Sequence, residues 1–243
     1  MESREAWIRV RRTARYRILG DPSSAGEVWF VVHGYGQLAE RFIRRFEGLP
    51  GLSGGERAVV APESLSRFYV ETERGPHGAS SRVGGSWMTR SDREHEIADY
   101  VEYLDRLAVS VLGGAGGSGD ASPARIPEGA IPTDGRRVVV LGFSQGAETA
   151  SRWVTYGRIA PAELVLWGGG LAEDLDPDRA AESLAGVRVR LVVGDADRWA
   201  RRRADWSATF LAGLGVPPDR VPYAGGHRVE PEVLAREWGD GSR

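Results

Sequence analysis

Short, continuous apolar runs alternate along most of this chain with segments of helical period. Runs of about 4–8 hydrophobic residues are typical of parallel strands that are covered on both faces. We expect such strands at 28–32, 57–62, 138–141, 164–167, 189–193 and 221–223. Apolar spacing and helix-start signals predict helices at 38–46, 91–112, 147–156, 177–184, 204–214 and 231–238. This alternation predicts an α/β fold, with a mainly parallel central sheet and helices on both faces.

Three segments depart from the regular alternation. Two strand-like runs interrupted by arginine, within 6–19, predict an antiparallel hairpin at the edge of the sheet. The sequence Ser91-Asp92-Arg93-Glu94 has the pattern of a capping box that opens a helix. Residues 113–135 are rich in glycine, proline and serine and predict a surface loop or insertion. Strand and helix patterns continue after this loop, so we expect residues 1–243 to form a single domain.

Composition and charge exclude several classes of protein. The formal net charge of −2 argues against a nucleic-acid partner, which requires a basic surface. No stretch approaches the roughly 20 apolar residues of a membrane span, and the arginine-rich N-terminus lacks the apolar region of a signal peptide. We therefore expect a cytoplasmic protein. The absence of cysteine and lysine excludes disulfides, thiolate chemistry and Schiff bases.

The motif Gly142-x-Ser144-x-Gly146 lies between the most strand-like run of the chain and a helix. A sharp turn from strand to helix holds a serine in strained backbone geometry, and a side chain at either glycine would collide with neighbouring backbone. The helix that follows directs its N-terminal N–H groups toward the place where an oxyanion would form. This context favours a nucleophilic Ser144 over a structural turn that happens to contain serine.

A serine hydroxyl is a poor nucleophile unless a base removes its proton, and four histidines are available. We expect His33, in a glycine turn, to structure its loop, and His77 and His95 to be exposed to solvent. His227 follows the last predicted strand and two glycines. It is also the only histidine after Ser144, where the chain order Ser, Asp, His that accompanies this type of turn requires the base.

The acid that orients the histidine is expected in the loop after the strand 189–193. This loop reads Gly194-Asp195-Ala196-Asp197, so it offers two candidates. Either aspartate could reach an imidazole and hold its tautomer. The other would cap the following turn or pair with Arg198. Position alone does not distinguish Asp195 from Asp197.

An oxyanion site requires two converging N–H donors. In this type of site one donor is the residue after the nucleophile, here Gln145, and the other comes from a loop after an early strand. The turn His33-Gly34-Tyr35-Gly36 is suited to the second part, because its glycines allow backbone N–H groups to face a ligand. The side chain of Tyr35 would either line the pocket or pack within the loop.

Together these motifs resemble the phospholipase/carboxylesterase branch of the α/β-hydrolases, which includes acyl-protein thioesterases and bacterial carboxylesterases. The matching segments are 33–36, 142–147, 194–197 and 226–232, and the resemblance spans Val28 to Trp238. It implies the α/β-hydrolase fold, Asp197 as the acid, and Tyr35 and Gln145 as oxyanion donors. It also implies hydrolysis of carboxylic esters, thioesters or lysophospholipids without a metal or another cofactor.

Two segments differ from the pattern of the thioesterases, and both lie where a substrate pocket is expected. Tyr35 and Gln37 stand where leucine and aspartate are usual, and Arg198-Trp199-Ala200 replaces the usual Val-Pro after the acid. The substrate therefore does not carry over from the resemblance. We expect Tyr69, Trp87, Met88 and Trp199 to line an aromatic pocket, although each could instead belong to the core. No basic cluster beside the elbow is evident, and Arg201-Arg202-Arg203 is interpreted as a solvated helix start.

Three functions compete at this point. The first, which we favour, is a carboxylesterase that acts on a small-molecule ester with a short- or medium-chain acyl group or a small aromatic group. The second is a lysophospholipase or thioesterase, for which longer chains would require an apolar lid that is not evident in the sequence. The third is an inactive binding protein with a hydrolase fold, which usually lacks a triad member, whereas no member is missing here.

Overall fold

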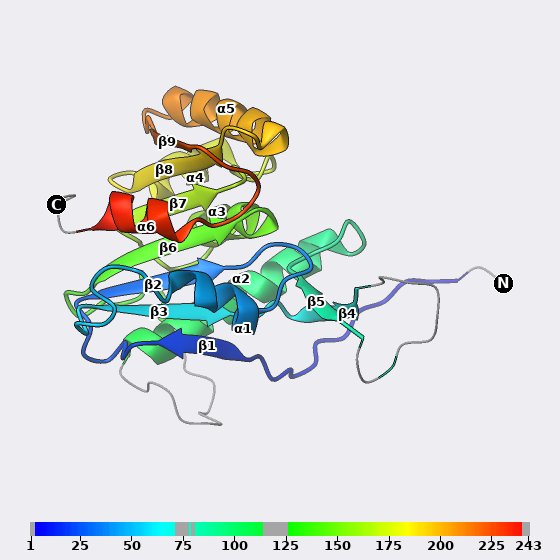
Figure 1. Ribbon diagram of the computed structural model, residues 1–243. Coiled ribbons are helices and arrows are strands. Elements are labelled where there is room, and N and C mark those ends of the chain that lie inside the picture. The colour runs from blue at the N-terminus through cyan, green and yellow to red at the C-terminus, as the bar shows by residue number, and fades with distance from the viewer. Residues whose placement is uncertain (1–2, 71–77, 79–80, 114–125, 240–243) are drawn as a thin grey trace.

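The computed structural model describes residues 3–70, 78, 81–113 and 126–239 (Figure 1). Within these ranges, seven strands form one sheet in the order β1-β3-β2-β6-β7-β8-β9. The strands are β1 (Tyr16–Leu19), β2 (Glu27–Val32), β3 (Arg57–Pro62), β6 (Arg137–Phe143), β7 (Glu163–Trp167), β8 (Arg188–Gly194) and β9 (Asp219–Tyr223). All neighbours are parallel except β1, which pairs antiparallel with β3.

Helices cover both faces of this sheet (Figure 1). The helical elements are α1 (Ala39–Phe42), η1 (Ile43–Phe46), α2 (Arg93–Leu112), α3 (Gln145–Tyr156), α4 (Pro177–Ser183), α5 (Arg198–Gly213) and α6 (Pro231–Trp238). Buried residues of α2, α3, α4 and α5 pack in one apolar cluster, and those of α1, η1 and α6 pack in another. In β2, Phe30 belongs to the first cluster and Trp29 to the second, as the alternation of side chains along a strand requires. The predicted α/β architecture is therefore confirmed.

A buried ionic network lies at the start of the central strands. Glu163, the first residue of β7, is 1% exposed, and its carboxylate lies 2.9 Å from Arg190 Nε and 2.6 Å from Arg137 Nη2. It also accepts a hydrogen bond from the indole of Trp238 at 3.0 Å. A buried carboxylate is tolerated because several cations and donors compensate it. This network is at the opposite end of the strands from the loops that follow β6, β8 and β9.

The predicted edge hairpin is wrong. Only Tyr16–Leu19 forms a strand, and it pairs with β3 rather than with the residues before it. Residues 3–15 contain no strand and are mostly exposed, with Ile8 87% and Val10 78% exposed. Antiparallel pairing with β3 gives β1 a partner that already belongs to the core, whereas an isolated hairpin has little apolar surface to bury.

The predicted capping box is also not formed. Helix α2 begins at Arg93, and its N-cap Asp92 has φ 53° and makes no side-chain hydrogen bond to the helix N–H groups. Asp92 Oδ1 instead accepts a hydrogen bond from the indole of Trp7 (3.2 Å) and lies 2.7 Å from His95 Nδ1. Contacts with an N-terminal segment distant in sequence thus replace the local cap.

Other boundaries differ from the sequence prediction in smaller ways. The predicted helix 38–46 is divided between α1 and η1, and α5 begins at Arg198 instead of 204 because the side chain of Asp197 caps it. A two-stranded antiparallel sheet of β4 (Ser66–Tyr69) and β5 (Val83–Ser86) was not predicted. Of the predicted loop 113–135, residues 126–135 form no helix or strand and 114–125 lie outside the described residues. In the part of the chain described, no helix has the length and apolar character of a membrane span.

Candidate active site

Ser144 occupies the turn between β6 and α3 and has the strained backbone that the motif predicts. Its φ is 55° and its ψ is −120°, a conformation that non-glycine residues rarely adopt. The flanking glycines are required by close contacts. A Cβ on Gly142 would lie 2.1 Å from the carbonyl oxygen of Gly146, and a Cβ on Gly146 would lie 2.2 Å from the carbonyl oxygen of Val32. The tight turn thus presents the serine side chain beyond the end of the strand.

His227 lies in the loop between β9 and α6 and reaches the serine. Its Nε2 is 2.9 Å from Ser144 Oγ. The ring packs beside Phe143, with centroids 4.9 Å apart, and has Trp199 at its edge, 5.9 Å away. Gly168 leaves room for the ring, since a Cβ there would lie 3.3 Å from His227 Nδ1. Packing on these sides holds the imidazole in line with the serine.

The structure distinguishes the two aspartates that the sequence left open. Asp197 is 7% exposed, and its Oδ2 lies 2.5 Å from His227 Nδ1, while its Oδ1 accepts the N–H of Ala200 at 3.0 Å. Asp195 instead accepts the N–H of Gly225 at 3.0 Å. Asp195 therefore supports the loop that carries the histidine, and Asp197 contacts the imidazole itself. An Nδ1–H that donates to Asp197 leaves Nε2 free to accept the serine proton.

The turn after β2 lies against the serine, where the sequence predicts a second oxyanion donor. A Cβ on Gly34 would lie 3.2 Å from the Cβ of Ser144. The N–H of Gly34 donates to Gln37 Oε1 (2.9 Å), and that of Gly36 donates to the carbonyl of Gly85 (2.8 Å). Between them, the N–H of Tyr35 has no hydrogen-bond partner among the described residues.

Gln145, the residue after Ser144, has a backbone N–H that is unpaired among the described residues and a side chain that contacts a neighbouring segment. Within the described ranges, the backbone N–H of Gln145 has no hydrogen-bond partner, as expected for the first residue of a helix. Its side chain holds the segment that follows β5. Oε1 accepts the N–H of Trp87 at 3.1 Å, and Nε2 donates to the carbonyl of Met88 at 3.0 Å.

Two residues expected in the pocket have other positions. Trp87 is 2% exposed, and its indole N–H donates to the carbonyl of His33 at 2.8 Å. Trp87 therefore joins the turn after β2 to Gln145 and does not line the cavity described below. Met88 is half-buried, packs against the core, and has its sulfur 3.5 Å from Arg152 Nη1. Trp199, 46% exposed, stands beside His227.

The other described histidines, His33 and His95, make no hydrogen bond to the serine hydroxyl. His33 is fully buried, and its Nε2 accepts the N–H of Ser64 at 3.1 Å, as expected for a residue that structures its loop. Burial lowers the pKa of His33 to about 4. His95 is exposed, as predicted, and pairs with Asp92, while His77 lies outside the described residues.

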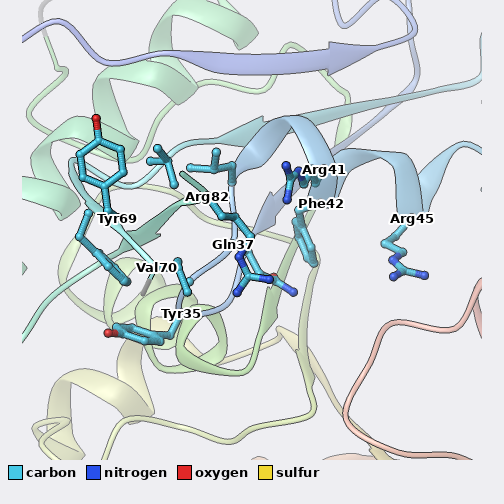
Figure 2. Close-up of a pocket in the computed structure, with 12 residues that line it drawn as sticks. Tyr35, Gln37, Arg41, Phe42, Arg45, Tyr69, Val70 and Arg82 are labelled. Carbon is cyan, nitrogen blue, oxygen red and sulfur yellow. The ribbon is translucent and has the colours of Figure 1, made fainter. Parts of the chain in front are cut away.

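A cavity of about 630 Å³ opens beside the turn His33–Gly36 (Figure 2). The sequence predicted only some of the residues that line it. The predicted Tyr69 lines it, together with Tyr35 and Phe42. Its other lining residues are Gly36, Gln37, Leu38, Arg41, Arg45, Phe68, Val70, Arg82 and Val83. Three arginines that the sequence prediction did not single out line this cavity beside the turn after β2: Arg41 and Arg45 from one segment and Arg82 from another. The i, i+4 spacing of Arg41 and Arg45 directly after the glycine turn was the available signal.

Arg201 and Arg202 are exposed near the start of α5, as the sequence suggested, whereas Arg203 is half-buried. Arg203 extends toward α3 and the loop after β7. Its Nη2 donates to the carbonyl of Leu171 at 2.7 Å and lies 3.0 Å from Glu148. Arg203 therefore ties helices together and does not face the serine.

The order of the strands and the turn after β6 define the class of fold. The mainly parallel sheet, with a strained serine between its central strand and a helix, is that of the α/β-hydrolases. No protein-family model matches the sequence, and no curated protein matches it.

Solved structures with this fold resemble nearly the whole chain. A carboxylesterase from Mesorhizobium loti has a TM-score of 0.66 and 20% identity, with 94% of this chain and 95% of that chain covered. Acyl-protein thioesterase 2 from Zea mays has a TM-score of 0.61 and 16% identity, covering 92% and 96%. A phospholipase/carboxylesterase from Dyadobacter fermentans has a TM-score of 0.59 and 16% identity, covering 96% and 98%. At these identities the likeness shows the α/β-hydrolase fold.

Proposed function

We propose that the protein is a serine hydrolase that cleaves carboxylic esters through an acyl-enzyme, with Ser144 as nucleophile, His227 as base and Asp197 as the group that orients the base. The observation that carries this proposal is the continuous chain of contacts from Asp197 Oδ2 through both imidazole nitrogens to Ser144 Oγ. Such a chain raises the reactivity of a hydroxyl that is otherwise a poor nucleophile.

In the first half of the reaction, Ser144 Oγ attacks the carbonyl carbon of the ester while His227 Nε2 takes its proton. The carbonyl oxygen becomes an oxyanion, which the N–H groups of Gln145 and Tyr35 stabilise. The C–O bond to the alcohol then breaks, the alcohol leaves with the proton from Nε2, and the acyl group remains on Oγ. Asp197 stabilises the imidazolium that forms between these two steps.

Water completes the cycle. It attacks the acyl carbonyl as His227 Nε2 takes one of its protons, and the bond to Ser144 Oγ breaks as Nε2 returns that proton to Oγ. The products are a carboxylic acid and the free serine. These steps require proton transfer and electrostatic stabilisation, which the triad side chains and the backbone N–H groups of Tyr35 and Gln145 would supply.

Covalent labelling by a fluorophosphonate probe tests the proposal directly. We expect wild-type protein to be labelled and the Ser144→Ala variant to remain unlabelled. A folded wild-type protein that neither reacts with the probe nor hydrolyses any ester would overturn the proposal and favour a binding protein. Hydrolysis of 4-nitrophenyl esters of increasing chain length then separates a carboxylesterase, fastest on short or medium chains, from a lysophospholipase or thioesterase that prefers long ones.

A further inference from the structure

Among the described residues, the cavity beside the turn His33–Gly36 is lined by positive charge without a matching negative charge. Arg41, Arg45 and Arg82 line it, and among the described residues no aspartate or glutamate does. No ion pair or side-chain hydrogen bond joins these three arginines to another described residue. Most other arginines beside this region are paired, as Arg17 is with Glu40 and Arg67 with Glu63. Three cations that share one cavity and have no ion-pair partner among the described residues favour an anion within it.

The cavity lies close to the serine. Gly34 lies next to Ser144, because a Cβ on Gly34 would be 3.2 Å from the Cβ of Ser144. Gly36, two residues later, lines the cavity. Two Cα steps span at most about 7 Å. Phe42 forms part of the wall and stacks on Phe143, with centroids 6.1 Å apart. The edge of the cavity at Gly36 therefore lies within one small molecule's length of Ser144.

The position of His227 decides which part of an ester enters the cavity. Its Nε2 must give a proton to the leaving alcohol, so the alcohol lies on the side of the imidazole and Trp199. Neither of these residues lines the cavity, which lies beyond the turn that carries Tyr35. The acyl part of the ester is therefore the part that extends toward Arg41 and Arg82.

The aromatic side chains that line the cavity suit an acyl chain that links the ester carbonyl to a terminal anionic group. Tyr35 and Phe68 stack with centroids 5.1 Å apart, and Tyr69 is the next lining residue. Figure 2 shows Tyr35 and Tyr69 on one side of the cavity and Arg45 on the other. Methylene groups can lie along the rings while a terminal anion reaches the guanidinium groups.

The geometry points to an ester whose acyl part ends in an anionic group, a carboxylate or a phosphate, as the preferred substrate class. This inference rests on the proposed function, and it assigns Arg41, Arg45 and Arg82 to recognition of that group. Exposed ion pairs contribute modestly, so three together are expected to favour an anionic acyl chain over a neutral one by roughly tenfold in kcat/KM. Added salt should reduce this preference, since all three arginines are exposed.

A matched set of substrates tests the inference. The 4-nitrophenyl ester of monomethyl adipate is neutral, the corresponding half-ester of adipic acid carries a carboxylate, and an ω-phosphonate ester of similar length carries a phosphate-like group. The measured quantity is the ratio of kcat/KM for each anionic ester to that for the neutral ester. Because both values come from the same preparation, loss of folded protein cancels in the ratio. The ester with the larger ratio identifies carboxylate or phosphate as the preferred group.

Variants of the lining arginines complete the test. We expect the triple variant Arg41→Gln, Arg45→Gln, Arg82→Gln to bring the ratio close to one. Arg44→Gln is the matched control: Arg44 lies in the same 3-10 turn, is exposed and does not line the cavity, so its variant should keep the wild-type ratio. A wild-type ratio of one or less, or one that the triple variant leaves unchanged, would overturn the inference while hydrolysis of the neutral ester and probe labelling still supported the proposed function. Absence of both labelling and hydrolysis would overturn the two together.

Discussion

Asp197 accepts two hydrogen bonds, one on each carboxylate oxygen, and an asparagine at this position could accept only one of them. One oxygen contacts His227 Nδ1 and the other caps α5 through the N–H of Ala200. In an Asp197→Asn variant, the amide has one acceptor and one donor end. If the amide oxygen keeps the cap, the NH₂ faces Nδ1 and forces the proton onto Nε2, so His227 can no longer accept the proton of Ser144. If the oxygen faces Nδ1 instead, the helix loses its cap.

The size of the expected effect follows from these two arrangements. Losing an N-cap costs about 1 kcal/mol of unfolding free energy, so the arrangement that keeps the cap and reverses the tautomer is favoured. A histidine in the wrong tautomer lowers kcat by about 10⁴-fold in a serine protease triad. We therefore expect Asp197→Asn to reduce kcat by about 10³–10⁴-fold with little change in thermal stability.

The assay is steady-state hydrolysis of a short-chain 4-nitrophenyl ester, with Ser144→Ala setting the background and a thermal melt reporting stability. Asp195→Asn is the matched control, because an amide oxygen can still accept the N–H of Gly225. It should change kcat by no more than about twofold. The reasoning is refuted if Asp197→Asn retains near wild-type kcat, or if Asp195→Asn loses as much activity as Asp197→Asn.

Three further outcomes are expected. Trp87→Phe removes the indole N–H that donates to the carbonyl of His33. It should lower kcat roughly tenfold with KM nearly constant, because displacing an oxyanion donor costs less than deleting it. Unchanged kcat and KM would contradict this prediction. The depressed pKa of His33 (about 4, against 6.5) means that the unfolded chain binds more protons than the folded protein below pH 6.5. The free energy of unfolding, measured by denaturant titration, should therefore fall by about 1.4 kcal/mol per pH unit from pH 6 toward 4.5. The fall should be less steep in His33→Gln. Glu163→Ala leaves Arg190 poorly compensated and should cost about 3–5 kcal/mol of unfolding free energy, with labelling of Ser144 at 25 °C preserved; a loss under 1 kcal/mol would argue against a buried pair.

The sequence was most informative where local chemistry leaves few alternatives. Gly142 and Gly146 indicated a turn with no room for side chains at these two positions. A Cβ on either glycine would lie near 2 Å from a backbone carbonyl oxygen, which explains why none is tolerated. His227 could be selected because it is the only histidine after Ser144. The choice of Asp197 over Asp195 required the resemblance, because two carboxylates in one short loop differ only in direction, which the structure supplies.

The sequence was least informative where distant segments meet. The cap expected at Ser91 was displaced by Asp92, whose carboxylate contacts Trp7, some eighty residues earlier in the chain. The basic cavity escaped prediction because Arg82 follows β4 while Arg41 belongs to α1 and its neighbouring turn, and no spacing rule relates the two. Aromatic character alone suggested that Trp87 contacts substrate, whereas its two N–H groups both bond within the protein.

The two hydrogen bonds donated by Trp87 affect which residues of the candidate site could change to accept other substrates. Trp87 bonds the carbonyl of His33 and the side chain of Gln145, so it fixes the two segments that carry the proposed oxyanion donors before any substrate binds. A change there would disturb every substrate alike. New preferences would be more readily acquired at Arg41, Arg45 and Arg82, which line the cavity and make no hydrogen bond or ion pair with Ser144, Asp197 or His227.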